Sequence, residues 1–149
     1  MTEQEIAEIC KKYNIKNWTL NSMSNLIDVD GDVDLYNKNL TELPLPFGDV
    51  NGMFSCGYNN LTSLEHSPEN VGDYFGCTSN NLTSLEHAPK NVGGDFYCCF
   101  NKLVSLEHSP KYIGGDFECE YNKIIQRQNI NLLNVGGNIY ADNNFKWIF

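Results

Sequence analysis

Three consecutive 21-residue stretches of this chain are nearly identical, and they decide its fold. They read NLTSLEHSPENVGDYFGCTSN (60–80), NLTSLEHAPKNVGGDFYCCFN (81–101) and KLVSLEHSPKYIGGDFECEYN (102–122). A repeat with a fixed period of about 20 to 29 residues is typical of solenoid proteins, in which each repeat forms one rung that packs only on its neighbours. The sequence therefore predicts a stack of similar rungs in place of a single globular core.

The stretches share the pattern F-x-C-x-x-N-x-L-x-x-L, which matches the core of a leucine-rich repeat. We expect its Phe, Cys and Leu side chains to point inward, and its Asn to bond backbone groups where each strand bends away. The inward set is Phe54, Cys56, Leu61, Leu64, Phe75, Cys77, Leu82, Leu85, Phe96, Cys98, Leu103, Leu106, Phe117, Cys119 and Ile124. The asparagine ladder is Asn59, Asn80, Asn101 and Asn122.

The repeat can be followed in both directions from these copies. The Gly-Asp-Val at 31–33 aligns with the Gly-Asp-Phe at 94–96, which makes the segment from Asn25 the first rung. Apolar and acidic residues alternate there as in a strand, with Ile27, Val29, Val33 and Leu35 inward. We expect six short parallel strands in one sheet, joined by extended or 3₁₀ returns through proline and glycine. The strands are predicted to begin near Val33, Phe54, Phe75, Phe96, Phe117 and Ile139.

The fold class expected is a mainly β, α/β repeat: a leucine-rich-repeat solenoid of about six 21-residue units with its parallel sheet on the concave face. Residues 1–24 are predicted to form an N-terminal helical cap, 25–144 the solenoid, and 145–149 an apolar C-terminal cap. A helix is expected over residues 3–13 because its apolar side chains recur at helical spacing. That apolar stripe consists of Ile6, Ile9, Cys10 and Tyr13.

The aligned segments resemble short leucine-rich-repeat proteins of tailed phages and some bacteria. The resemblance rests on IDVDGDVDLYNKNLTELPLPFGDVNG (27–52) and on SLEHSPENVG (63–72), SLEHAPKNVG (84–93) and SLEHSPKYIG (105–114), and it covers essentially the whole chain. The chain is also similar to the repeat domains of short-repeat bacterial effectors, but without their catalytic domain, so their ligase activity is not implied. The resemblance implies a protein-recognition scaffold. Lys38, where the ladder has asparagine, and the 22-residue interval from Phe117 to Ile139 depart from the pattern.

The overall composition limits the classes of partner. A formal net charge of −9 and an isoelectric point near 4.6 argue against binding to a nucleic-acid backbone and favour a basic protein surface. The chain contains no apolar run near the ~20 residues of a membrane span, and its N-terminus lacks the pattern of a signal peptide. We therefore expect a cytoplasmic protein, located in the host cytosol if it is phage-encoded, with reduced cysteines and no membrane contact. It is expected to be a monomer or a weak homo-oligomer that associates through its C-terminal end.

No pattern of residues predicts a cofactor, a metal site or an enzyme. The inward cysteines lack the clustered C-x-x-C spacing of metal ligands, and the stacked His66, His87 and His108 are better explained by a repeated turn. The acidic run at 28–34 lacks the glycine and glutamate of a calcium loop. Two catalytic alternatives stay open: a hydrolase using Asp116 and Glu118, or a thiol enzyme using Cys99, which is expected to point onto the open face.

The outward positions of the predicted strands contain neither lysine nor arginine, although the chain has 10 such residues. Tyrosines are interspersed among carboxylates there, and these side chains are expected to face water and to contact a partner. The predicted partner-binding residues are Asp32, Asp34, Tyr36, Met53, Tyr74, Asp95, Tyr97, Asp116, Glu118, Glu120, Tyr140 and Asp142.

These features lead to one main functional hypothesis. The chain is expected to be a non-enzymatic module that docks a basic protein on this face, including the case of a phage-encoded inhibitor of a host or defence protein. One alternative is a nucleic-acid mimic that blocks a basic nucleic-acid-binding site. The other is a structural or assembly component whose adhesive end is Trp147, Ile148 and Phe149.

Overall fold

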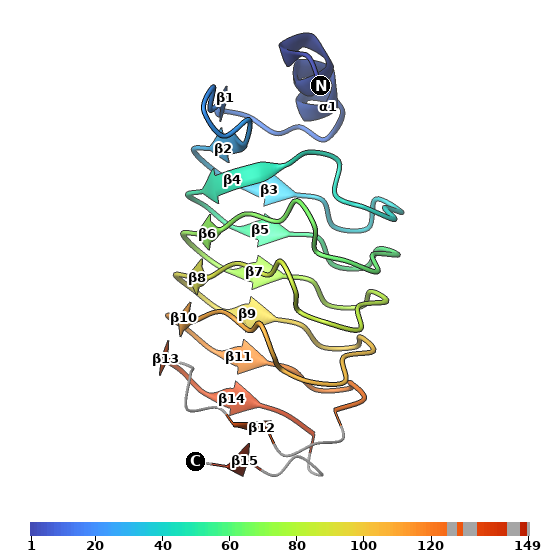
Figure 1. The fold of residues 1–149 in the computed structure, drawn as a ribbon, viewed down its shortest axis with the longest axis vertical. Coiled ribbons are helices and arrows are strands. Elements are labelled where there is room, and N and C mark those ends of the chain that lie inside the picture. The colour runs from blue at the N-terminus through green and yellow to red at the C-terminus, as the bar shows by residue number, and fades with distance from the viewer. Residues whose placement is uncertain (125–127, 130–133, 143–146, 149) are drawn as a thin grey trace.

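The computed structural model describes residues 1–124, 128–129, 134–142 and 147–148, and it is a β-solenoid. The rungs stack along one long axis, with the helix α1 (Glu3–Lys12) at one end (Figure 1). Equivalent residues of successive repeats lie side by side, since Phe54 pairs with Phe75 and Phe75 pairs with Phe96. The predicted mainly β repeat architecture with an N-terminal helix is therefore confirmed.

Each rung contributes one short strand to a six-stranded parallel sheet, and these strands begin where the sequence predicts. The order of the strands is β14-β11-β9-β7-β5-β3. Their bounds are β3 (Val33–Asp34), β5 (Phe54–Ser55), β7 (Phe75–Gly76), β9 (Phe96–Tyr97), β11 (Phe117–Glu118) and β14 (Ile139–Tyr140).

A second sheet, which the sequence did not predict, runs along the solenoid and is formed by the extended return segments. Its order is β1-β2-β4-β6-β8-β10-β13, and all its pairs are parallel except β1 with β2. The return segments were predicted as extended or 3₁₀, and no 3₁₀ helix occurs among the described residues. Strands of two residues are too short to show an alternating pattern in the sequence. The bounds are β1 (Trp18–Leu20), β2 (Ile27–Val29), β4 (Phe47–Val50), β6 (Asn70–Val71), β8 (Asn91–Val92), β10 (Tyr112–Ile113) and β13 (Asn134–Val135).

The core consists of columns of equivalent side chains. The rings of Phe54 and Phe75 stack with their centroids 5.5 Å apart, and Phe96 continues the column at the same spacing. All three are 0% exposed. The predicted inward residues are confirmed as buried, apart from Ile124, which is half-buried and packs against the core. Repetition of one packing arrangement therefore fills the interior.

The asparagine ladder is also confirmed. The Oδ1 of Asn101 accepts the N–H of Leu82 at 3.0 Å, and its Nδ2 donates to the carbonyl of Cys77 at 3.0 Å. Equivalent bonds are made by Asn59, Asn80 and Asn122. Because these bonds cross from one rung to the previous one, they satisfy buried backbone groups and fix the register between rungs.

The alternating segment of the first rung is two strands and not one. Gly31, with a φ of +145°, separates β2 from β3, which lie in different sheets. The apolar residues do point inward as predicted: Ile27, Val29, Val33 and Leu35. The acidic residues bond the second rung, since Asp28 accepts the N–H of Asp49 at 2.8 Å and Asp32 accepts the N–H of Met53 at 2.9 Å. The acidic run thus supports the stacking of the rungs.

Glycines at the corner between the sheets allow the rungs to stack closely. A Cβ on Gly93 would lie 2.1 Å from the carbonyl oxygen of Gly72, a distance at which the backbone of the neighbouring rung would have to move. Gly76, on β7, is different. The nearest atom to a Cβ there is in the ring of Tyr74, at 3.6 Å, which is an ordinary van der Waals contact. The stacking of the fold therefore requires glycine at 93 but not at 76.

The two ends of the solenoid are covered differently. Thr2 and Glu5 form a capping box at the start of α1, with Thr2 N–H donating to Glu5 Oε2 at 2.6 Å, and the predicted helix is confirmed. Its apolar stripe packs on the first rungs through Ile6, Ile9, Cys10 and Tyr13. No helix in the described part of the chain is long and apolar enough to cross a membrane. The predicted C-terminal cap at 145–149 lies outside the described residues, except that β15 (Trp147–Ile148) pairs with β12 (Gln128–Asn129).

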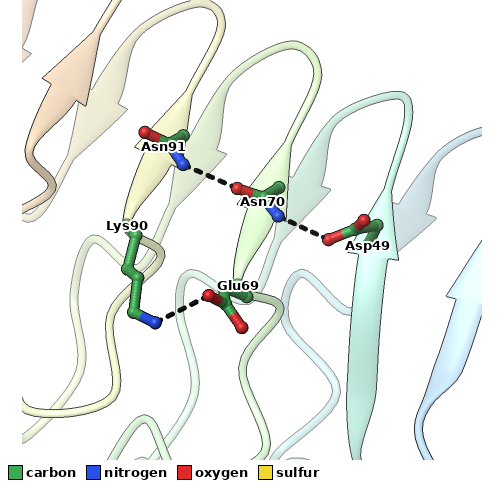
Figure 2. A network of polar contacts seen from close by, with 5 residues as sticks. All are labelled: Asp49, Glu69, Asn70, Lys90 and Asn91. Carbon is green, nitrogen blue, oxygen red and sulfur yellow. Dashed lines mark hydrogen bonds and ion pairs between the residues drawn. The ribbon is translucent and has the colours of Figure 1, made fainter.

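Polar side chains link the rungs on the seven-stranded sheet (Figure 2). The Nδ2 of Asn91 donates to Asn70 Oδ1 at 2.7 Å, and the Nδ2 of Asn70 donates to Asp49 Oδ1 at 2.7 Å. Beside them, Lys90 Nζ lies 2.6 Å from Glu69 Oε1 in an exposed ion pair. Lys90, in the return segment after a proline, is therefore paired with the equivalent segment of the previous rung.

Candidate functional site

The predicted partner-binding residues lie on the outer side of the six-stranded sheet and at the ends of its strands, which we call the presented face. Phe96 is wholly buried while Tyr97 is not, so the predicted alternation of sides holds. The exposed members are Asp32, Asp34, Tyr36 and Tyr140. The half-buried members are Met53, Tyr74, Asp95, Tyr97, Asp116, Glu118, Glu120 and Asp142. Their role in binding stays a prediction.

Several carboxylates of the presented face belong to the fold, which corrects the expectation that these side chains simply face water. Asp95 Oδ1 accepts the N–H of Asp116 at 2.7 Å, and Asp116 Oδ1 accepts the N–H of Asn138 at 2.7 Å. Asp142 accepts the N–H of Tyr121 at 3.0 Å. Each bond joins neighbouring rungs, so replacing these aspartates would weaken the stack as well as change the charge.

Tyr97 is held in place at the centre of the face. Its hydroxyl donates to Asp95 Oδ2 at 2.6 Å, and its ring meets the ring of Tyr74 edge to face at a centroid distance of 5.8 Å. The hydrogen bond to Asp95, followed by burial and by the nearby charges of Glu118 and Asp116, raises the pKa of Tyr97 well above its usual value. Tyr97 is therefore a neutral, fixed aromatic surface beside carboxylates.

Glu118 and Glu120 are the carboxylates of the face that the fold does not use. Neither makes a side-chain hydrogen bond or an ion pair within the described residues. Burial raises the pKa of Glu118, and repulsion from Glu120, Asp116 and Asp95 adds to the effect. Because like charges gather here and no ion pair among the described residues neutralises them, an approaching positive group would be attracted to this end of the face.

A groove on the same face, two to three rungs from these glutamates, was not predicted. It has a volume of about 400 Å³ and is walled by the rings of Tyr36, Tyr74 and Tyr97. Its floor consists of small residues: Ser55, Gly57, Gly76 and Thr78. Glycine at two outward strand positions was the signal in the sequence, because a missing side chain between aromatic neighbours leaves a hollow.

An exposed aromatic row borders the face and was also missed. Tyr58, Phe100 and Tyr121 precede ladder asparagines and have left-handed backbones, with φ of 54°, 53° and 57°. The ring of Tyr58 lies 5.0 Å from that of Tyr36, and Phe100 stacks on Tyr121 at 4.3 Å. Left-handed φ is uncommon for bulky residues and costs conformational energy, so the repeated exposed rings are a feature to test.

The cysteines are buried free thiols without an activating group. Burial raises the pKa of Cys56 to about 12, and Cys77 and Cys98 shift in the same direction for the same reason. Cys99, expected on the open face, is 6% exposed, and burial raises its pKa to about 11. The expectation that Cys99 is open to solvent was therefore wrong. The geometry offers no support for a thiol nucleophile at Cys99.

The other residues considered for chemistry have structural surroundings. Asp116 Oδ1 is engaged by the N–H of Asn138 in the next rung, so this carboxylate contributes to the stacking of the rungs. The predicted turn role of the histidines agrees with their left-handed backbones, with φ of 73°, 67° and 65° at His66, His87 and His108. No group of three His, Cys, Asp or Glu side chains among the described residues could hold a metal ion.

Comparisons with known proteins add no further constraint. None of the family models, curated proteins or solved structures compared with the chain matches it. The fold and the geometry of the presented face are therefore the basis for a functional assignment.

Proposed function

We propose that this chain is a non-enzymatic protein-binding module that docks a basic protein on the presented face. The observation that carries this proposal is the uncompensated pair Glu118 and Glu120 on the same face as a groove walled by tyrosines. Tyrosine rings supply contact area at small entropic cost, and carboxylates steer a positively charged partner and favour its correct orientation.

The biological purpose follows from the resemblance to phage and bacterial short-repeat proteins. Under this proposal the chain acts in the bacterial cytoplasm, and as a phage product it would inhibit a host or defence protein by covering a basic surface. A nucleic-acid mimic requires rows of free carboxylates. That alternative is weaker here, because Asp95 and Asp116 are bonded within the sheet and tyrosines interrupt the row.

The proposal can be tested by capture from a bacterial lysate with three versions of the full chain as bait. One is the wild type, the second carries Glu118→Lys and Glu120→Lys, and the third carries Glu86→Lys and Glu107→Lys. The third is the control, because its exposed loop glutamates undergo the same charge change away from the face. A partner of the face would be retained by the wild type and the control and lost from the second bait.

The contradicting result is equally clear. If every specifically retained protein binds the Glu118→Lys and Glu120→Lys bait as well as the wild type, the presented face is not the docking surface. Circular dichroism of the three baits serves as the check that each is folded.

A further inference from the structure

We infer that the presented face binds an extended, basic peptide segment that lies across the strands. One apolar side chain of the segment occupies the tyrosine-walled groove, and a basic residue three or four positions away contacts Glu118 and Glu120. This inference rests on the proposed function and makes it more specific. It names the kind of segment that the partner offers and the spacing of its two contact residues.

The groove fits an apolar side chain. Its walls are the rings of Tyr36 and Tyr74, each of which leans toward a glycine: a Cβ on Gly57 or Gly76 would lie 3.6 Å from the ring. A hollow of about 400 Å³ accepts one or two side chains, and it is too small to receive the flat surface of a domain. Removing such a side chain from water against aromatic rings favours binding.

The acidic end fits a cation. Tyr97 separates the groove from Glu118, and Glu118 pairs with Tyr97 on the adjacent strand. The described part of this face contains no lysine or arginine that could neutralise Glu118 and Glu120. Charge complementarity therefore selects lysine or arginine as the second contact of the segment.

The spacing of the two contacts follows from the geometry of the sheet. The groove is centred between β5 and β7, and Glu118 is on β11, so the two sites are two to three rungs apart. Rungs are separated by about 4.8 Å, which places the contacts roughly 12 Å apart. An extended chain advances about 3.3 Å per residue, so roughly 12 Å corresponds to three or four residues.

The inference can be tested with short synthetic peptides and the isotope-labelled full chain, followed by nuclear magnetic resonance. The probe is a capped peptide of serine and threonine with one leucine and two successive arginines, the first of them four positions after the leucine. The comparison peptides have the same composition with leucine and arginine adjacent, or have leucine or both arginines replaced by serine. We expect the four-residue spacing to bind about tenfold more tightly than adjacent placement, with shifts at the amides of Gly57, Gly76 and Glu118.

Two variants of the protein separate the contacts. Gly76→Leu fills the groove from its floor, where a Cβ meets no backbone, and should remove the advantage of leucine while leaving the advantage of arginine. Glu118→Gln with Glu120→Gln should do the reverse. Thr83→Leu, in an exposed loop, is the control for adding a leucine elsewhere.

Each outcome decides the inference. It is overturned if no peptide gives saturable shifts up to about 5 mM, if spacing has no effect, or if the shifts lie on the seven-stranded sheet. The proposed function has a separate outcome. If the peptides fail while captured proteins still depend on Glu118 and Glu120, the partner docks as a folded surface, and only the peptide inference is wrong.

Discussion

Replacing Asn101 by alanine tests whether the asparagine ladder holds adjacent rungs together. Asn101 is 7% exposed and makes bonds to the previous rung and to its own strand. Two of its carbonyl partners keep another donor, because Asn80 also bonds Cys77 and Asn122 also bonds Cys98. The N–H of Leu82 has no such substitute among the described contacts, so the alanine variant leaves this buried donor unpaired.

The size of the effect follows from these contacts. An unpaired buried N–H costs about 1–3 kcal/mol, and each lost bond to a carbonyl that keeps a partner costs about 0.5 kcal/mol. We therefore expect Asn101→Ala to lower the free energy of unfolding by about 2–4 kcal/mol, a large fraction of the ~5–15 kcal/mol of a typical domain.

The assay is urea unfolding, together with hydrogen exchange of the Leu82 amide, which should become faster. Asn81→Ala is the matched control, because the side chain of Asn81 is half-buried and makes no hydrogen bond in the described structure. This control should change the free energy of unfolding by less than about 0.5 kcal/mol. Equal, small effects of the two substitutions would refute the reasoning that the ladder bonds stabilise the stack.

Three further predictions concern the corner, the thiols and the face. Gly93→Ala should destabilise the chain by more than about 2 kcal/mol in urea unfolding, because its Cβ would meet a backbone oxygen of the neighbouring rung. Gly76→Ala is the control and should be nearly neutral. The reverse order of the two effects would contradict the stacking of the rungs. With a pKa of about 11, Cys99 is ionised in about one molecule in a thousand at pH 8. Iodoacetamide should therefore label Cys99 far more slowly than free cysteine. Fast labelling would show that the thiol is not buried. The pKa of Glu118 is raised in the folded chain, so its ionisation lowers stability as pH rises through the unfolded and folded pKa values. Glu118→Gln should therefore be more stable than the wild type near pH 7 and equal to it below about pH 3.5. A gap of the same size at both pH values would show that burial and the neighbouring carboxylates do not raise the pKa of Glu118.

The sequence predicts the parts of this fold that repeat. The 21-residue period fixes which residues are equivalent, and the hydrophobic Phe, Cys and Leu positions fix which side is inward. The start of each strand in the six-stranded sheet and the whole ladder follow from these two facts. The second sheet does not, since a segment such as Asn91–Val92 contains one apolar residue next to polar neighbours and shows no period.

The candidate site was predicted less completely than the fold. Alternation places Asp95, Tyr97 and Glu118 on one face, but it cannot tell which carboxylates bond the next rung. The distinction between Asp95 and Glu118 depends on atoms of the neighbouring repeat. The groove likewise depends on how the ring of Tyr74 leans toward Gly76, which is a matter of packing and not of period.

The most direct test of the proposed docking surface is hydroxyl-radical footprinting of the chain with and without a captured partner. Tyr36 on the presented face and Tyr112 on the seven-stranded sheet are matched probes, because their exposed fractions are 47% and 44%. We expect the partner to slow the oxidation of Tyr36 several-fold and to leave Tyr112 unchanged. Protection of Tyr112 with unchanged oxidation of Tyr36 would contradict the assignment and place the binding surface on the opposite sheet.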